Sequence, residues 1–383
     1  MNPAALPRLR TAQLTLGEKL RALHWPLVGL LLAIGAVGYA MLYSAGGGSH
    51  GPWAWRHGLR LAVGFPLMLA VALIEPRFWF KLAYPCYGLV LAMLVAVDVL
   101  GEINKGAQRW LDLGFMQLQP SELMKVALVL ALARYFHAAY LPDLRRPWVL
   151  GPALLLILLP SALVLVQPDL GTAVTLLVSG AALLFMAGVP LWLFAAAGCL
   201  GAAVVPVLWA NLHDYQRRRV FTFLDPEADP LGSGYHIIQS KIALGSGGFW
   251  GRGYLQGSQA QLSFLPEKHT DFAFTMLAEE LGFLGAIGVL ALFLLVILFG
   301  LVAAIRAPSQ FGRLLAVGVV LNLFIYVAIN VSMVTGLIPV VGVPLPLISY
   351  GGTAMLTLVV SLGLLLSVDL HRHAAIPRFP VDL

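Results

Sequence analysis

The segment FLPEKHTDFAF, residues 264–274, gathers ionisable side chains directly before a long apolar run. Thr270 is suited to cap a helix that begins here, and Asp271 would then lie in the first turn of that helix. The helix dipole stabilises an ionised carboxylate at this position. An ionised, positioned carboxylate is suited to general-base chemistry. Acidic residues are also common in first turns without a catalytic role, so this segment alone leaves both interpretations open.

A second acid–base pair occurs in QPSELMK, residues 119–125. Glu122 and Lys125 are three residues apart, which places them on one face of a helix. Ionisable side chains inside a membrane are costly and indicate a functional site by default. A structural ion pair between neighbouring helices has the same pattern, so both roles remain open here.

Three further segments are expected on the same side of the membrane as Asp271 and Glu122. GAQRWLDLG contains Arg109, whose guanidinium can bind phosphate with two hydrogen bonds, and Trp110, which is typical of an interfacial anchor. QPDLGTA contains Asp169, for which a helix-capping role is favoured. Residues 335–356 are rich in Pro and Gly and largely apolar, and we expect a stiff rim that contacts lipid or another protein.

The elements that position these residues are predicted from composition. The chain has 383 residues, of which 60% are hydrophobic and 11% are charged, against about 25% charged residues in soluble proteins. This composition predicts an all-α polytopic membrane protein. Apolar runs long enough to cross a bilayer predict about ten spanning helices. Their expected extents are 25–45, 59–75, 78–100, 121–138, 148–166, 169–188, 190–210, 271–304, 312–336 and 350–370.

Clusters of Lys and Arg precede the first predicted span and follow the second, fourth, eighth and tenth. An even number of spans places all of these clusters on one side, which the positive-inside rule makes cytoplasmic. We therefore expect cytoplasmic tails at residues 1–24 and 371–383, and one transmembrane domain over residues 25–370.

A large loop on the outer side, residues 211–270, is predicted between the seventh and eighth spans. Long loops in compact domains are usually functional. This loop is basic although it faces outward, and it contains Arg218, Arg219, Lys241 and Lys268. A basic outer loop indicates an anionic ligand on that side of the membrane.

Several other classes of site are not supported. The net charge of +6 needs no nucleic acid, because cytoplasmic loops of membrane proteins are basic. Cys86 and Cys199 lie in apolar runs and are interpreted as packing residues. The histidines and cysteines show no metal-ligand spacing. GSGGFWGRG, residues 245–253, lacks the strand context of a nucleotide-binding loop, so ATP hydrolysis within this chain is not expected.

These segments together resemble the SEDS family (shape, elongation, division and sporulation), and within it the RodA branch rather than the FtsW branch. The resemblance extends from about residue 25 to about residue 370. The run SGYHIIQSKIALGSGG followed by FLPEKHTDF is its most specific part and favours the RodA branch. It is carried by QPSELMK, QPDLGTA, DPEADPLGSGYHIIQSKIALGSGGFWGRG, FLPEKHTDFAF, AEELGFLG and VGVPLPLISYGG.

The resemblance implies ten transmembrane helices and a peptidoglycan glycosyltransferase of the bacterial cytoplasmic membrane, active in cell elongation and rod-shape maintenance. Such an enzyme joins lipid II units into glycan strands on the outer face. The 4-hydroxyl of the acceptor GlcNAc attacks the anomeric carbon of the donor MurNAc, undecaprenyl diphosphate leaves, and the configuration inverts. The family's essential aspartate corresponds to Asp271, and its acid–base pair corresponds to Glu122 and Lys125.

This chemistry agrees with the residue types. Inverting glycosyl transfer needs a carboxylate base, which Asp271 would supply. A diphosphate leaves as an anion and needs cations more than an acid. A divalent cation, Mg²⁺ or Mn²⁺, could share this task, although the sequence names no ligand set. The residues expected to bind the substrate are Lys125 first, then Arg109, then Arg218, Arg219, Lys241, Lys268 and His269.

The resemblance also implies partners. A class B penicillin-binding protein would cross-link the new strands, because this chain has no Ser-x-x-Lys motif on a soluble domain. Other proteins of the elongation complex and membrane lipid complete the expected partners. A lipid II flippase is the main alternative, because buried charges among many helices are also typical of transporters. A scaffold that only recruits cell-wall proteins is a third. Substitution of Asp271 separates these functions.

Overall fold

The chain forms a bundle of long helices, as the hydropathy pattern predicts. In the part of the chain that the structure describes, ten helices have 18 or more residues, and three shorter ones, α1 (Leu16–Ala22), α10 (Ser233–Ser246) and α11 (Ser258–Gln261), lie outside them. The computed structural model describes residues 15–104, 107–112, 114, 117–139, 146–211, 217, 221–222, 225, 233–261, 264–265, 267–373 and 376–377.

The long helices agree closely with the predicted spans. Eight of the described helices are long and apolar enough to cross a membrane, and α5 is too highly charged to be counted among them. The prediction of about ten helices in a polytopic membrane protein is confirmed. The ten are α2 (Trp25–Ala45), α3 (Trp53–Leu73), α4 (Pro76–Leu100), α5 (Pro120–Ala138), α6 (Pro147–Val166), α7 (Leu170–Ala187), α8 (Leu191–Asn211), α12 (Ala273–Arg306), α13 (Gln310–Val334) and α14 (Gly352–Leu370).

One predicted boundary is wrong by six residues. The second span was expected to begin at residue 59, whereas α3 begins at Trp53. Arg56, His57 and Arg60 lower the hydropathy of its first two turns. These polar side chains lie at the end of the helix, where they do not need to cross the apolar part of a bilayer.

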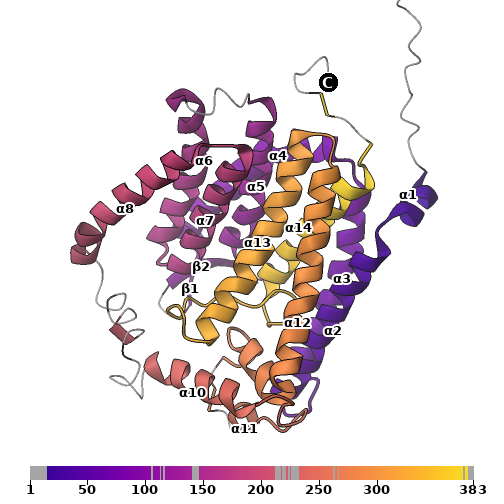
Figure 1. The fold of residues 1–383 in the computed structure, drawn as a ribbon, viewed down its shortest axis with the longest axis vertical. Coiled ribbons are helices and arrows are strands. Elements are labelled where there is room, and N and C mark those ends of the chain that lie inside the picture. The colour runs from indigo at the N-terminus through magenta and orange to yellow at the C-terminus, as the bar shows by residue number, and fades with distance from the viewer. Residues whose placement is uncertain are drawn as a thin grey trace, which may run out of the picture.

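The two ends of the bundle differ in what they carry (Figure 1). One end, here called the tail end, carries α1 and the C-terminus of α14. Lys19 Nζ donates to the Leu73 carbonyl at 3.0 Å, and Ser367 Oγ donates to the Ile74 carbonyl at 2.5 Å. The opposite end, here called the loop end, carries α10 and α11. Because the helices alternate in direction, the starts of α5, α7 and α12 meet at the loop end.

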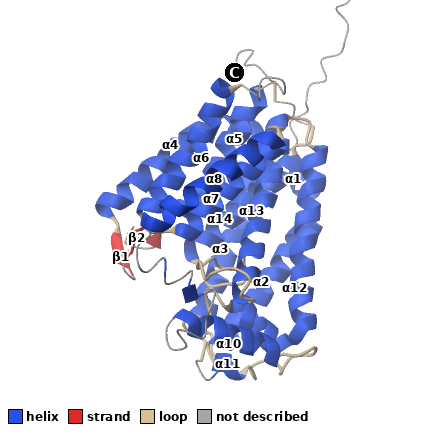
Figure 2. Ribbon diagram, turned by 60° about the vertical axis from the view of Figure 1, so that its left-hand side comes forward, coloured by secondary structure: helices blue, strands red, loops and turns tan. Residues whose placement is uncertain are grey.

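A small antiparallel sheet lies at the loop end between α4 and α5 (Figure 2). It consists of β1 (Glu102–Asn104), β2 (Ala107–Asp112) and β3 (Gln117–Leu118), in that order. The sequence did not indicate this sheet, because strands this short carry no clear alternation. The central strand, β2, fixes the positions of Arg109 and Trp110.

The core of the bundle is formed by α5, α13 and α14. Leu128, Phe311, Leu315 and Leu362 are at most 1% exposed. Helix α8 instead leans away from the other helices (Figure 1), and Trp192 near its start is exposed. An exposed apolar helix is stable where lipid surrounds it, because all its backbone hydrogen bonds are internal.

Helix α12 is interrupted near its first third. It has 34 residues, so it is roughly 50 Å long, against a bilayer core of about 30 Å. Gly282 has φ 68° and ψ −167°, which breaks the helical path. The loop before α12 pairs with the exposed backbone: the Arg252 amide donates to the Glu279 carbonyl at 3.0 Å, and the Phe283 amide donates to the Gly248 carbonyl at 2.9 Å.

The glycines of GSGGFWGRG permit this close approach. A Cβ atom at Gly247 would lie 2.1 Å from the Ala278 carbonyl oxygen, and one at Gly251 would lie 2.2 Å from the Glu280 carbonyl oxygen. No side chain fits at either distance. The segment is therefore a backbone clamp on the α12 kink.

A side chain placed at the kink should destabilise the protein measurably. Gly282→Ala should lower the free energy of unfolding by about 1–3 kcal/mol, because only glycine readily adopts this backbone conformation. The measurement is the thermal midpoint of the purified protein in detergent. Gly288→Ala is the matched control, because a Cβ there meets no atom within 4 Å. Equal thermal midpoints for Gly282→Ala and Gly288→Ala would show that a side chain at the kink causes no strain.

Candidate active site

Asp271 lies just before α12, not in its first turn. The N-cap of α12 is Phe272, so the prediction of a Thr270 N-cap is wrong. Thr270 Oγ1 donates instead to the carbonyl of Glu267 at 3.2 Å and to its carboxylate at 3.0 Å. This local turn uses the hydroxyl that the cap would need. Asp271 is half-buried and is positioned through its backbone, because its carbonyl accepts from Asn330 Nδ2 at 2.9 Å.

The same asparagine positions a second segment. Asn330 Nδ2 also donates to the Val343 carbonyl at 2.7 Å, which draws residues 337–349 toward Asp271. Gly342 then passes so close that a Cβ there would lie 3.4 Å from Asp271 Oδ2. Val343 and Leu345 in this segment are buried. The expectation of an apolar rim for residues 335–356 is therefore wrong for its central part, which folds inward because its apolar side chains pack against the bundle.

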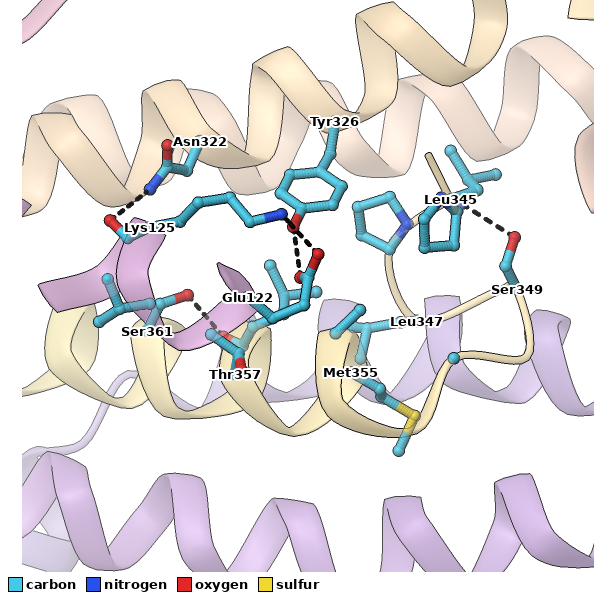
Figure 3. Close-up of a pocket in the computed structure, with 16 residues that line it drawn as sticks. Glu122, Lys125, Asn322, Tyr326, Leu345, Leu347, Ser349, Met355, Thr357 and Ser361 are labelled. Atoms are coloured by element: carbon cyan, nitrogen blue, oxygen red, sulfur yellow. Dashed lines mark hydrogen bonds and ion pairs between the residues drawn. The ribbon is translucent and has the colours of Figure 1, made fainter. Parts of the chain in front are cut away.

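Glu122 and Lys125 form the buried pair that their spacing predicts (Figure 3). They are 5% and 4% exposed, and Lys125 Nζ lies 2.6 Å from Glu122 Oε1. Tyr326 of α13 completes a triangle: its hydroxyl donates to Glu122 Oε2 at 2.5 Å and accepts from Lys125 Nζ. The lysine also lies 4.3 Å from the centre of the tyrosine ring.

Tyr326 and its neighbours on α13 were not among the predicted site residues. Asn322, Tyr326 and Asn330 follow one another at intervals of four residues, so they form a polar stripe on one face of α13. Asn322 Oδ1 accepts from Ser179 Oγ of α7 at 2.6 Å, and its Nδ2 donates to the Lys125 carbonyl at 3.4 Å. This spacing inside an apolar run was the signal in the sequence that would have found the stripe.

Arg109 clamps the turn before α7. Its Nε donates to the Gln167 carbonyl at 3.1 Å, and its Nη2 donates to the Pro168 carbonyl. Its Nη1 lies 4.0 Å from Asp169 Oδ1. Asp169 is the N-cap of α7 and accepts from the Thr172 amide at 3.2 Å, which confirms its expected capping role. Arg109 is thus held in place by backbone carbonyls on one side.

One cavity of about 450 Å³ connects these groups. It brings together side chains from β2, α5, the turn before α7 and the turn before α12, all at the loop end. We call it the carboxylate cavity, after the acidic side chains in its walls. Its lining includes Arg109, Glu122, Lys125, Asp169, Asp271 and Tyr326.

Three other predicted substrate-binding residues are not among the residues that line this cavity. Lys268 and His269 lie in the turn before Asp271, and the His269 ring stacks on Trp53 with 4.5 Å between ring centres. Burial lowers the pKa of Lys268, and the negative charge of Glu280 opposes this shift. Lys241 is exposed on α10. Arg218 and Arg219 lie outside the described residues.

The described part of the chain offers no preformed metal site, because no three His, Cys, Asp or Glu side chains gather there. Cys86 and Cys199 are both free thiols, and Cys199 is exposed. At the carboxylate cavity this chain supplies carboxylates together with a lysine and an arginine.

Comparison with known proteins gives consistent matches over nearly the whole chain. The chain is 48% identical to the peptidoglycan glycosyltransferase MrdB of Escherichia coli K12 over 344 residues, which cover 90% of this chain and 92% of that protein. It superposes on the crystal structure of RodA from Thermus thermophilus with a TM-score of 0.70 and 30% identity, over 92% of this chain and 98% of that one.

A further solved structure is that of a peptidoglycan synthase complex, and it concerns the structural coordination of polymerization and crosslinking by that complex. It matches with a TM-score of 0.79 and 35% identity over 92% of this chain and 99% of that one. The model of the cell cycle protein family FTSW_RODA_SPOVE matches residues 19–374. The chain therefore belongs to the FtsW, RodA and SpoVE family of cell cycle proteins.

Proposed function

We propose that this chain is a peptidoglycan glycosyltransferase that joins lipid II units into glycan strands during cell elongation. The observation that carries the proposal is the carboxylate cavity, in which Asp271 shares one space with the cations Lys125 and Arg109. Glycosyl transfer from a lipid diphosphate requires this combination, a base for the acceptor and cations for the leaving group. The name of the Escherichia coli relative, peptidoglycan glycosyltransferase, supports it.

Asp271 is the proposed general base. As the acceptor's GlcNAc 4-oxygen attacks the anomeric carbon of the donor's MurNAc, its proton passes to the Asp271 carboxylate. The bond from that carbon to the diphosphate oxygen breaks, and its electron pair leaves with undecaprenyl diphosphate. Attack opposite the leaving group converts the α-linkage into a β-linkage, as in inverting reactions that use a carboxylate base.

Lys125 and Arg109 are proposed to stabilise the leaving diphosphate. An ammonium group has three donors, and Lys125 uses two of them for Glu122 and Tyr326. The third donor can be directed to a phosphate oxygen. Arg109 is held by the Gln167 and Pro168 carbonyls, which orients its guanidinium at the cavity wall. Such preorganised donors gain most where charge develops in the transition state.

A divalent cation remains a prediction from the chemistry of the diphosphate. Phosphate oxygens themselves are common ligands of Mg²⁺, which often keeps several waters. No cluster of protein ligands for a resident metal occurs among the described residues, so each step above is assigned to side chains of this chain.

The proposed site faces the outer side of the cytoplasmic membrane. The tail end is rich in basic residues, which the positive-inside rule assigns to the cytoplasm. The carboxylate cavity lies at the opposite, loop end, where the starts of α5 and α12 meet. Basic residues at the tail end include Arg77, Lys81, Arg306, Arg313 and Arg372.

A class B penicillin-binding protein is the proposed partner. This proposal is supported by the similarity to the peptidoglycan synthase complex that coordinates polymerization and crosslinking. Helix α12 offers apolar side chains at its surface, such as Phe283 and Leu294, which are 55% and 53% exposed. Such a surface near the eighth and ninth spans can pack against a partner's single transmembrane helix.

Asp271→Asn should reduce glycan polymerisation from purified lipid II by about a hundredfold or more, because it removes the base. The assay contains the partner penicillin-binding protein, and Asp271→Ala should behave alike. The asparagine keeps the side-chain shape and leaves the main-chain bond to Asn330 in place. Asp112→Asn is the matched control: this exposed carboxylate on the same face accepts from the Gly114 amide at 2.7 Å.

Three outcomes would contradict this proposal. A wild-type rate of polymerisation in Asp271→Asn would exclude Asp271 as the general base and make Glu122 the next candidate for that role. A wild-type protein that makes no strands but moves lipid II across vesicles would favour the flippase. A protein that does neither, yet still recruits its partner, would favour the scaffold.

The buried pair can be tested with a double substitution. Lys125→Met alone should cost about 3–5 kcal/mol of stability, because the Glu122 charge stays buried without its cation. Glu122→Gln combined with Lys125→Met should regain most of that stability while polymerisation stays lost, because the cation for the diphosphate is still missing. The measurements are thermal unfolding and strand synthesis on the same preparations. Recovery of both by the double variant would make the pair purely structural.

A further inference from the structure

A second cavity adjoins the carboxylate cavity at the loop end. It has a volume of about 730 Å³. It lies between the first turns of α3, the sheet and the start of α14, and we call it the arginine cavity. Trp110, Thr270, Tyr350, Gly351 and Gly352 line both cavities and form the boundary between them. The residues on its far side are Arg56, Leu59, Arg60, Val63, Gln117 and Leu356.

The arginine cavity continues onto an apolar face of α3. Leu59 and Val63 line the cavity and are four residues apart, so they lie on one side of the helix. They are 54% and 57% exposed. In a membrane this side of α3 contacts lipid chains. A polyprenyl chain can therefore lie along α3 while its head group enters the cavity.

Arg60 gives the cavity a site for an anion. Its Nη2 donates to the Tyr350 hydroxyl at 3.2 Å, and its guanidinium lies 4.3 Å from the centre of the Tyr350 ring. Its Nη1 is buried and has no hydrogen-bond partner among the described residues. A buried donor without a partner is costly. Arg56 lies one turn earlier on the same face of α3, so a second guanidinium is available to the same anion.

The two cavities differ in charge. The carboxylate cavity holds Glu122, Asp169 and Asp271 along with its cations. Among the described residues that line the arginine cavity there is no Asp or Glu. The arginine cavity therefore suits an anionic group that binds without reacting, since no base lines it.

The two lipid substrates place their diphosphates differently. In the donor, the diphosphate is bonded to the carbon that is attacked, so donor diphosphate, base and cations must share one space. In the acceptor, the reacting hydroxyl is on the sugar farther from the diphosphate. The acceptor diphosphate is therefore anchored one disaccharide away from the base.

We propose that the arginine cavity binds the acceptor lipid through its diphosphate, with Arg60 and Arg56 as the binding residues, and that the carboxylate cavity binds the donor. This assignment rests on the proposed glycosyltransferase function. The acceptor's chain lies along Leu59 and Val63, its diphosphate on the arginines, and its disaccharide crosses the boundary beside Tyr350 to reach Asp271.

Two lipid analogues separate donor from acceptor. Lipid II with its GlcNAc 4-hydroxyl capped by a further sugar can only donate. Lipid II with a methylene group in place of the anomeric oxygen can only accept, because the carbon–carbon bond from its anomeric carbon to the methylene group does not break. Together they give one pentasaccharide product, so each KM is measured with the other analogue saturating.

Arg60→Gln should raise KM for the acceptor analogue about tenfold or more, because a charge-assisted hydrogen bond to phosphate is lost. KM for the donor analogue should stay within about twofold of wild type, because Arg60 binds the acceptor and not the donor. Arg60→Lys should recover part of the acceptor affinity. Arg306→Gln, an exposed arginine at the tail end, is the matched control. Arg56→Gln gives a second variant if Arg60→Gln does not fold.

Each result decides a separate question. A wild-type protein that makes no pentasaccharide would overturn the proposed function itself. A wild-type protein that makes it, with Arg60→Gln and Arg56→Gln raising KM for the donor only, would overturn the assignment of the cavities. A fall in kcat with both KM values unchanged would mean that Arg60 only supports Tyr350, which also overturns the proposal.

Discussion

The buried triangle of Glu122, Lys125 and Tyr326 is the interaction on which the arrangement of α5 against α13 depends. Helices in a membrane gain little from hydrophobic association, so polar contacts between them matter more. Here each of the three side chains bonds to both others. Removing any single member would leave each of the other two with only one of its two bonds in an apolar interior. The triangle therefore fixes the relative positions of two central helices.

The remaining polar contacts extend this constraint to the site. Asn322 links the Lys125 carbonyl of α5 to Ser179 of α7, and Asn330 holds the carbonyls of Asp271 and Val343. The cation is thus positioned through side chains and the base through its main chain. Because the anchors differ, the positions of Lys125 and Asp271 are each fixed without a bond between the two side chains. One helix, α13, supplies both anchors, so the base and the cation move together if α13 moves.

Sequence patterns predicted what local composition determines. The long apolar runs predicted the ten helices, and the spacing of Glu122 and Lys125 predicted a pair on one face. Contacts between distant segments were not visible: Tyr326 lies some 200 positions from its partners. The Thr270 cap failed because the hydroxyl has a competing partner in Glu267. The rim predicted for residues 335–356 was wrong for its central part, because an apolar composition does not distinguish burial in protein from contact with lipid.

The boundary between the two cavities then acquires a chemical meaning. If the two lipids bind on opposite sides of Tyr350, the sugar of one must cross to the base on the other side. A wall of large side chains would prevent this. Tyr350 is held against one side by Arg60 and by its own amide, which donates to the His269 carbonyl at 2.7 Å. Beside it, Gly351 and Gly352 line both cavities and have no side chains. The glycines at the start of α14 thus add no side chain to this boundary, and the Arg60 guanidinium lies beside Gly352, where a Cβ would be 3.4 Å from Arg60 Nη2.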